Sequence, residues 1–175
     1  NFPFKNIINS LIYIPIVLPE IVLGISLLSI YTLMKLELGM FTIILSHIAF
    51  SIPFVVVSVK STLTRETIYY EEAAKDLGAS NFAIFKDIII PIIMPGIISG
   101  ATLAFTLSLD DVVISYFTAG PGSNTLPLYI YSMIKTGITP DVSALTTIML
   151  IITFVLLTSI AIIQSRKIRK AIWKK

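Results

Sequence analysis

Three carboxylates stand within or directly beside apolar stretches of this 175-residue chain. Glu20 is the only charged residue in Ile7–Leu33. Asp110 and Asp111 directly follow the uncharged run Ile88–Leu109. Inside a bilayer a carboxylate costs about 2.5–3.5 kcal/mol on insertion scales, and it usually faces a partner group or a wet cavity. We interpret these carboxylates as candidates for a cation pathway; the alternatives are helix–helix hydrogen bonding or an interfacial cap for the aspartates, and a hydrated kink residue for Glu20.

Two tyrosines, Tyr116 and Tyr31, are candidates to assist such a pathway. Tyr116 lies about one helical turn beyond Asp111, and an aromatic face attracts a protonated amine through a cation–π contact. Most of the seventeen phenylalanines and tyrosines are instead expected to face lipid or to pack between helices.

Groups for other chemistry are few. The chain has no cysteine and one histidine, His47, so we expect no thiol catalysis, disulfide or multi-histidine metal site. No stretch matches the GxGxxG or GxxxxGK[ST] phosphate loops, so no means of binding ATP is visible. We expect His47 to form hydrogen bonds between helices, with a proton-relay role as the alternative. A membrane enzyme would need clustered catalytic groups at one depth, so we predict no catalytic residue, no metal and no cofactor.

The elements that must position these residues are long apolar segments. Charged residues make up 13% of the chain, hydrophobic residues 55%, and the mean hydropathy is +0.92, whereas a soluble domain carries roughly 25% charged residues. Pro15 and Pro19 predict a kink in the first segment. Because a bilayer core needs ~20 helical residues, we predict an all-α, polytopic transmembrane helix bundle. It forms a single domain over 1–175, with spans at about 10–33, 39–59, 90–117 and 142–164.

The depth of the two aspartates depends on where the third span begins. A start near Ile97, after Pro95 and Gly96, places them 13–14 residues into the span, about 20 Å deep. A start at Ile88 places them at the outer interface instead. We favour the first register, which makes Gly96–Ala119 one span of 24 residues. Because neighbouring helical residues point about 100° apart, at most one aspartate faces the pathway, and the other is expected to accept hydrogen bonds from neighbouring helices.

The basic residues are distributed unevenly around the four spans. Eleven of the 13 Lys and Arg fall on the side that holds both chain ends and the 60–89 loop. Lys and Arg in short loops mark the cytoplasmic side, so we expect that side inside and the 119–141 loop outside, with a short helix at Leu126–Ile134. Six of the 13 lie in the last ten residues, which suits an anchor near anionic lipid. Without them the net charge is −3, so we expect no nucleic-acid-binding surface.

The 60–89 loop predicts two short helices that meet at a bend. Thr67 is a candidate cap for the first helix, Gly78 is a natural helix stop, and Ser80 is a candidate cap for the second. Ala73, Ala74 and Gly78 form a patch without bulk, where another backbone or side chain can approach closely. A plain interfacial connector is the alternative interpretation.

This loop also carries a spaced motif: Glu72-Ala73-Ala74, three residues, Gly78, nine residues, Ile88, one residue and Ile90-Pro91. The motif resembles the EAA motif of permease subunits of bacterial ABC importers, which usually have leucine at the place of Ile90. The resemblance implies a permease of the type I importer class, whose loop forms a coupling helix that docks into an ATP-binding subunit. The resemblance assigns the docking contacts to Glu72, Ala73, Ala74 and Gly78. It assigns the start of the next span to Pro91.

Outside the loop, the resemblance narrows to spermidine/putrescine permeases of the PotC type. Pro19-Glu20-Ile21 is similar to a Pro-acidic-aliphatic element of this group. The longer segments that carry the resemblance are PFVVV at 53–57, EEAAKDLGAS at 71–80, FTLSLDDVV at 105–113 and LPLYIYSMIKTGITPDVSAL at 126–145.

This resemblance implies polyamine import across a bacterial inner membrane, with ATP hydrolysis in a separate subunit. It also implies a second, PotB-like permease subunit and an extracytoplasmic polyamine-binding protein as partners, besides the lipid bilayer. Members commonly carry about six spans, so the four visible spans suggest a chain truncated on its N-terminal side.

Two alternatives stay open. The first is an importer permease for another solute, such as ferric iron or an oxyanion. Anion carriers would present helix N-termini or basic groups at mid-membrane, which this sequence does not place there, whereas an iron carrier would tolerate carboxylates. The second is a non-transport membrane assembly protein, in which the 60–89 loop would merely bind a neighbour.

Overall fold

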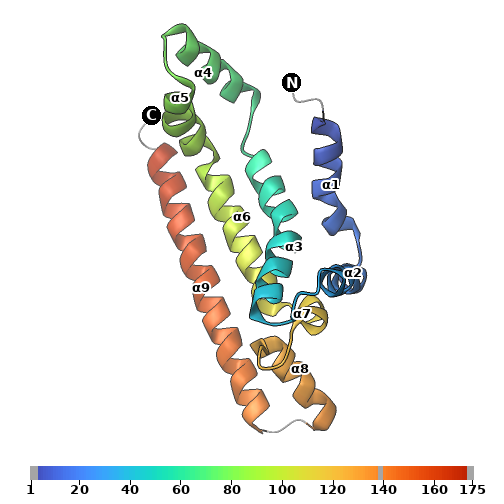
Figure 1. The fold of residues 1–175 in the computed structure, drawn as a ribbon. Helices are drawn as coiled ribbons and strands as arrows, with labels where there is room; N and C mark the ends of the chain where they lie inside the picture. The colour runs from blue at the N-terminus through green and yellow to red at the C-terminus, as the bar shows by residue number, and fades with distance from the viewer. Residues whose placement is uncertain (1–3, 138–139, 173–175) are drawn as a thin grey trace.

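The computed structural model describes residues 4–137 and 140–172, and within these ranges the secondary structure is helical (Figure 1). This confirms the predicted all-α helical bundle. One end holds α4, α5 and η1 together with the start of α1 and the end of α9, and the opposite end holds α7 and α8 (Figure 1). The elements are α1 (Lys5–Val17), α2 (Glu20–Leu33), α3 (Met40–Lys60), α4 (Arg65–Asp76), α5 (Asn81–Ile84), the π-helix η1 (Phe85–Ile89), α6 (Ile90–Asp110), α7 (Val113–Thr118), α8 (Leu126–Thr136) and α9 (Pro140–Ile172).

The first predicted span, at 10–33, is broken in the structure. The helices α1 and α2 meet at a bend of 116°, so the pair is either a broken span or a re-entrant loop. The break lies at Pro19, the N-cap of α2, because proline has no N–H and cannot continue the hydrogen-bond ladder of a preceding helix. Pro15 lies inside α1 without ending it. Three other helices of the described ranges are long and apolar enough to cross a membrane: Met40–Lys60, Asn81–Asp110 and Pro140–Ile162.

The third predicted span also contains a break. The chain is helical from α5 to Asp110, is extended at Asp111 (φ −63°, ψ 126°) and resumes as α7. A single helix over Gly96–Ala119 is therefore wrong, and the predicted span 90–117 is interrupted after α6. The physical reason is the Asp111 side chain, whose oxygens bind the N–H groups of the following turn. The depth of this region in the membrane stays a prediction.

Close packing of α3 against α6 forms the centre of the bundle. Gly96 and Gly100, four residues apart on α6, let the two backbones approach. A Cβ atom on Gly96 would lie 2.7 Å from the carbonyl oxygen of Ser58, and one on Gly100 would lie 3.0 Å from the Cα of Val55. The Ser58 hydroxyl also donates a hydrogen bond to the Gly96 carbonyl at 3.0 Å. These glycines therefore set the distance between the two helices.

The short helix α7 packs between α2 and α3. A Cβ atom on Gly24 of α2 would lie 2.6 Å from the Phe117 ring. On the other side, the Thr42 hydroxyl of α3 donates a hydrogen bond to the carbonyl of Thr118 at 2.7 Å. Thr42 and Thr118 are fully buried, so α7 is anchored by both apolar packing and polar contacts.

The helix predicted at Leu126–Ile134 is confirmed as α8, and the Thr125 hydroxyl caps it by accepting a hydrogen bond from the Leu128 N–H at 3.4 Å. The last helix, α9, lies beside α6 (Figure 1). None of its most apolar 18-residue window is buried within this chain. Its apolar surface is therefore available to lipid or to another subunit.

Candidate functional site

The helix α4 begins one turn earlier than predicted. Thr64 is its N-cap, and the Thr64 N–H donates to the hydroxyl of Thr67 at 3.2 Å. The predicted cap at Thr67 is therefore wrong: its hydroxyl supports the turn that precedes it. Glu71 and Lys75 form an ion pair at 2.6 Å across one turn of α4, but both side chains are over 40% exposed, so the pair contributes little to stability.

The predicted bend at Gly78 is confirmed. Gly78 has φ +80°, and its N–H donates to the Lys75 carbonyl at 2.9 Å, while the Ala79 N–H donates to the Ala74 carbonyl at 3.0 Å. These two bonds form a Schellman motif, which needs a residue with positive φ after the helix. The Ser80 hydroxyl then caps α5 by accepting a hydrogen bond from the Ala83 N–H at 3.2 Å. The chain thus turns sharply between α4 and α5.

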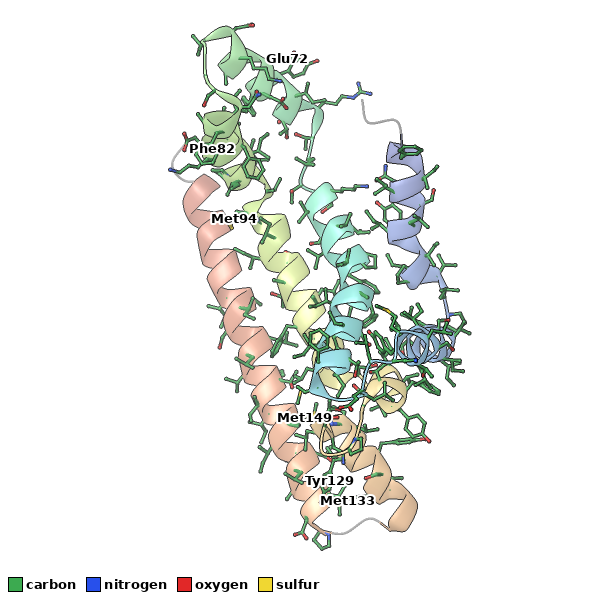
Figure 2. All side chains as sticks on the ribbon, in the orientation of Figure 1. Glu72, Phe82, Met94, Tyr129, Met133 and Met149 are labelled. Atoms are coloured by element: carbon green, nitrogen blue, oxygen red, sulfur yellow. The ribbon has the colours of Figure 1, made fainter. Side chains whose placement is uncertain are left out.

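The two halves of the spaced motif, residues 72–78 and 88–91, lie close together at this end of the molecule. Glu72 and Ala73 are exposed and Ala74 is half-buried, and Figure 2 places Glu72 and Phe82 at the same end. Apolar side chains are also exposed here, Leu77 at 89% and Phe82 at 74%, which is typical of a surface that binds another molecule. A hollow of about 410 Å³ joins the halves and is lined by Tyr70, Ala73, Ala74, Leu77, Asp87, Ile88, Pro91 and Ile92.

A buried polar cluster lies at the opposite end, where α6 stops. Asp111 accepts hydrogen bonds from the N–H groups of Ile114 at 3.0 Å and Ser115 at 2.7 Å, and from the Ser115 hydroxyl at 2.7 Å. The bond to the third residue ahead is the geometry of an N-cap. Asp111 thus stabilises the first turn of α7.

His47, on α3, contacts this cluster and also the end of α6. Its Nδ1 lies 2.7 Å from the hydroxyl of Ser108 on α6. Its Nε2 lies 3.1 Å from the hydroxyl of Ser115 and 3.2 Å from the Oδ2 of Asp111. The predicted interhelical hydrogen bonding of His47 is confirmed. In a hydrolytic triad the serine lies on Nε2 and the aspartate on Nδ1. Here Ser108 lies on Nδ1 and Asp111 on Nε2, so this cluster does not have that geometry.

The other predicted pathway residues differ in exposure. Glu20, Asp110 and Tyr116 are exposed. Tyr31 is 6% exposed, and its hydroxyl lies 2.9 Å from the Ser46 hydroxyl, within hydrogen-bond distance. Within this chain, Tyr31 therefore packs α2 against α3 and has no accessible ring face.

An aromatic hollow of about 390 Å³ is lined in part by residues that are close to the exposed carboxylates in the sequence. It includes Ile21, which follows Glu20, and Val112, which follows the two aspartates. Its full lining is Ile21, Val112, Val113, Tyr116, Phe117 and Tyr131. Tyr131 was not predicted from the sequence, although its place on the short helix expected at Leu126–Ile134 was a usable signal. Among the described residues, no three His, Asp or Glu side chains come together as a metal-binding group.

A bundle of long apolar helices, with an exposed helical bend at one end and a buried polar cluster at the other, defines a polytopic integral membrane protein. Residues 1–172 match the family described as "Binding-protein-dependent transport system inner membrane component", and the chain belongs to this family. It is therefore a multi-pass protein of the inner membrane, of the permease class. This family assignment confirms the resemblance seen in the spaced motif.

Curated relatives refine the comparison. The chain is 44% identical over 166 residues to the spermidine/putrescine transport system permease protein PotC of Escherichia coli strain K12, which covers 95% of this chain and 63% of the relative. It is 41% identical to the putrescine transport system permease protein PotI of the same strain, over 85% of this chain and 55% of the relative. It is 30% identical to the sulfate transport system permease protein CysT of Salmonella typhimurium, over 98% and 67%. The chain thus spans about 63% of the length of the PotC relative.

Proposed function

We propose that this chain is a transmembrane permease subunit of an ATP-driven importer that carries polyamines such as spermidine or putrescine into the cytoplasm. The observation that carries the proposal is the 44% identity to PotC across 95% of this chain. The chemistry agrees with it, because the carboxylates Glu20 and Asp110 are exposed and lie within two residues, along the chain, of Ile21 and Val112 in the lining of the aromatic hollow. A protonated polyamine offers ammonium groups to the carboxylates and an aliphatic chain to the hollow.

In this proposal, the bend between α4 and α5 docks onto a separate ATP-hydrolysing subunit, and this chain hydrolyses no ATP. Supporting features are the exposed apolar side chains at the bend and the small residues that let a partner approach. The end that holds the bend is cytoplasmic, and so are both ends of this chain. The docking contacts are Glu72, Ala73, Ala74 and Gly78, and Pro91 marks the start of the following span.

Force applied at the bend reaches the other end of the molecule through α6. This helix has 21 residues, about 31 Å at 1.5 Å per residue, and its glycines hold it tightly against α3. ATP-driven closure of the partner subunits pulls α4, and α3 and α6 tilt together between inward-open and outward-open states. Such coupling needs a free-energy difference between two global states that both sites sense.

The cation pathway in this proposal runs past Glu20, Asp110 and Tyr116. Tyr116 is 56% exposed, so its ring face can attract an ammonium group by a cation–π contact. A second permease subunit, of the PotB kind, supplies the other wall of the pathway, and an extracytoplasmic polyamine-binding protein delivers the substrate.

A permease for sulfate is the second candidate, because CysT is 30% identical over 98% of this chain. The exposed carboxylates at Glu20 and Asp110 argue against it, because they repel an oxyanion.

The deciding experiment is uptake by proteoliposomes that contain the complete importer. We expect ATP-dependent uptake of radiolabelled spermidine or putrescine, undiminished by sulfate or ferric iron; uptake of sulfate or iron without polyamine uptake contradicts the proposal. Liposomes with a hydrolysis-deficient ATPase subunit serve as the control.

A further inference from the structure

The adjacent aspartates at the end of α6 have opposite surroundings. Asp110 is exposed, whereas Asp111 is 8% exposed. The Oδ1 of Asp111 accepts the Ile114 N–H, and its Oδ2 accepts the N–H and the hydroxyl of Ser115. A carboxylate has about four lone-pair sites, and three are used within this chain. Little capacity is left for a substrate ammonium group.

His47 makes a fourth contact with Asp111, at the oxygen that already accepts both hydrogen bonds from Ser115. The Nε2 of His47 lies 3.2 Å from the Oδ2 of Asp111, a distance at which the tautomer with its proton on Nε2 donates to the carboxylate. The Nδ1 of that tautomer accepts the hydroxyl proton of Ser108 at 2.7 Å. No buried side-chain N or O atom in the described ranges lacks a hydrogen-bond partner. The cluster is therefore complete without a ligand.

The cluster joins α3 to the consecutive elements α6 and α7, whose Ser108 and Ser115 lie 61 and 68 positions from His47. His47 comes from α3, Ser108 from the last turn of α6 and Ser115 from α7. We infer that Asp111 and His47 are positioning residues: they fix α7, and with it Tyr116, at one place relative to α3 and α6, and the transported cation meets Asp110 instead. This inference rests on the proposed function for its substrate, but its geometric part does not.

The transport test compares the same substitution at neighbouring positions, in proteoliposomes that contain the complete importer. Asp110→Asn is expected to raise the half-saturating polyamine concentration about tenfold, with the maximal rate within about twofold of the parent. Asp111→Asn is expected to lower the maximal rate and to change the half-saturating concentration little. The reason is that its amide group places a donor against the donors of Ser115 and His47. A rise in the half-saturating concentration for Asp111→Asn equal to that for Asp110→Asn overturns the inference.

The second test needs no transport substrate. The chain has no cysteine, so Thr118→Cys introduces one thiol at a fully buried position of α7. In the complete importer, a maleimide is expected to label this thiol slowly, and roughly tenfold faster when Asp111→Asn loosens α7. Asp110→Asn is the matched control and is expected to leave the labelling rate unchanged. Equal labelling of the parent and Asp111→Asn overturns the inference.

Substitutions at His47 complete the design. His47→Leu is expected to speed labelling of Thr118→Cys as Asp111→Asn does, and the double variant is expected to be no faster than either single one, because both break the same contact. His47→Gln keeps a donor near the Nε2 position and is expected to label more slowly than His47→Leu. Additive effects of His47→Leu and Asp111→Asn overturn the inference. An importer that carries no polyamine refutes the proposed function, and the labelling rates still decide the positioning role.

Discussion

Alanine at Gly78 adds a single methyl group at the bend between α4 and α5. Gly78 has φ +80°, and no atom lies within 4 Å of the position that a Cβ atom would take. An L residue with a Cβ in this region costs roughly 1–2 kcal/mol, so Gly78→Ala strains the backbone without a steric clash inside the chain. If the ATP-hydrolysing subunit binds the bend in this shape, strain of that size lowers its affinity by roughly 5–30-fold.

A second glycine provides the matched control. Gly122 has φ +76°, again with no atom within 4 Å of a Cβ position, but it lies in the loop before α8, at the opposite end. Gly122→Ala is expected to strain the backbone equally and to leave affinity for the ATP-hydrolysing subunit unchanged. Gly78→Asn is expected to lie closer to the parent than Gly78→Ala, because asparagine tolerates positive φ better than other residues with a Cβ.

The assay is a titration of the ATP-hydrolysing subunit onto permease variants in nanodiscs, followed by substrate-dependent ATP hydrolysis. The expected order of affinity is parent and Gly122→Ala first, then Gly78→Asn, then Gly78→Ala. Equal losses for Gly78→Ala and Gly122→Ala would refute the reasoning, because they would show a general effect of strain. Unchanged affinity for Gly78→Ala would refute the assignment of the bend as the docking surface.

Three further predictions concern the bundle and the pathway. Gly96→Ala is expected to destabilise the purified complex by about 1–3 kcal/mol in thermal unfolding, because its Cβ would lie 2.7 Å from the Ser58 carbonyl oxygen. The control is Gly39→Ala, whose Cβ would have no atom within 4 Å. Equal losses of stability in the two variants would contradict the packing argument. Glu20→Gln is expected to raise the half-saturating polyamine concentration about tenfold, equivalent to 1.4 kcal/mol, and unchanged saturation in uptake assays would remove Glu20 from the pathway. Tyr116→Leu is expected to raise the same concentration roughly 2–30-fold through loss of a cation–π contact, whereas Tyr116→Phe keeps the ring and is expected to match the parent; similar values for both variants would exclude that contact.

Local residue types were sufficient to predict the bend between α4 and α5. A glycine that ends a helix and a serine that caps the next one act through atoms within four residues, so Gly78 and Ser80 were assigned correctly. The predicted start of α4 was wrong by three residues because Thr67 and Thr64 are both plausible caps. Only the direction of the Thr67 hydroxyl, toward the Thr64 N–H, distinguishes them.

The break after α6 depends on distant contacts as well as on the local bonds from Asp111 to Ile114 and Ser115. It is stabilised by a network that includes the pair of His47 and Ser115, which are 68 positions apart, and no local pattern reports such a pairing. Likewise, the type of Tyr31 suggested a pathway role, but the face of α2 that packs against α3 decides its burial. The spacing of Gly96 and Gly100 was a signal for close helix packing that the sequence contained and that was not used.

The π-helix η1 sets the rotational phase between the docking bend and α6. The Ile90 N–H donates to the Phe85 carbonyl, five residues back, so this turn holds one residue more than an α-helical turn. One residue corresponds to about 100° of rotation about the helix axis. If η1 changed into regular α-helix, α6 would rotate about its own axis by about that angle relative to the bend. A different face of α6 would then be presented at the opposite end of the molecule, although the helix itself would stay continuous.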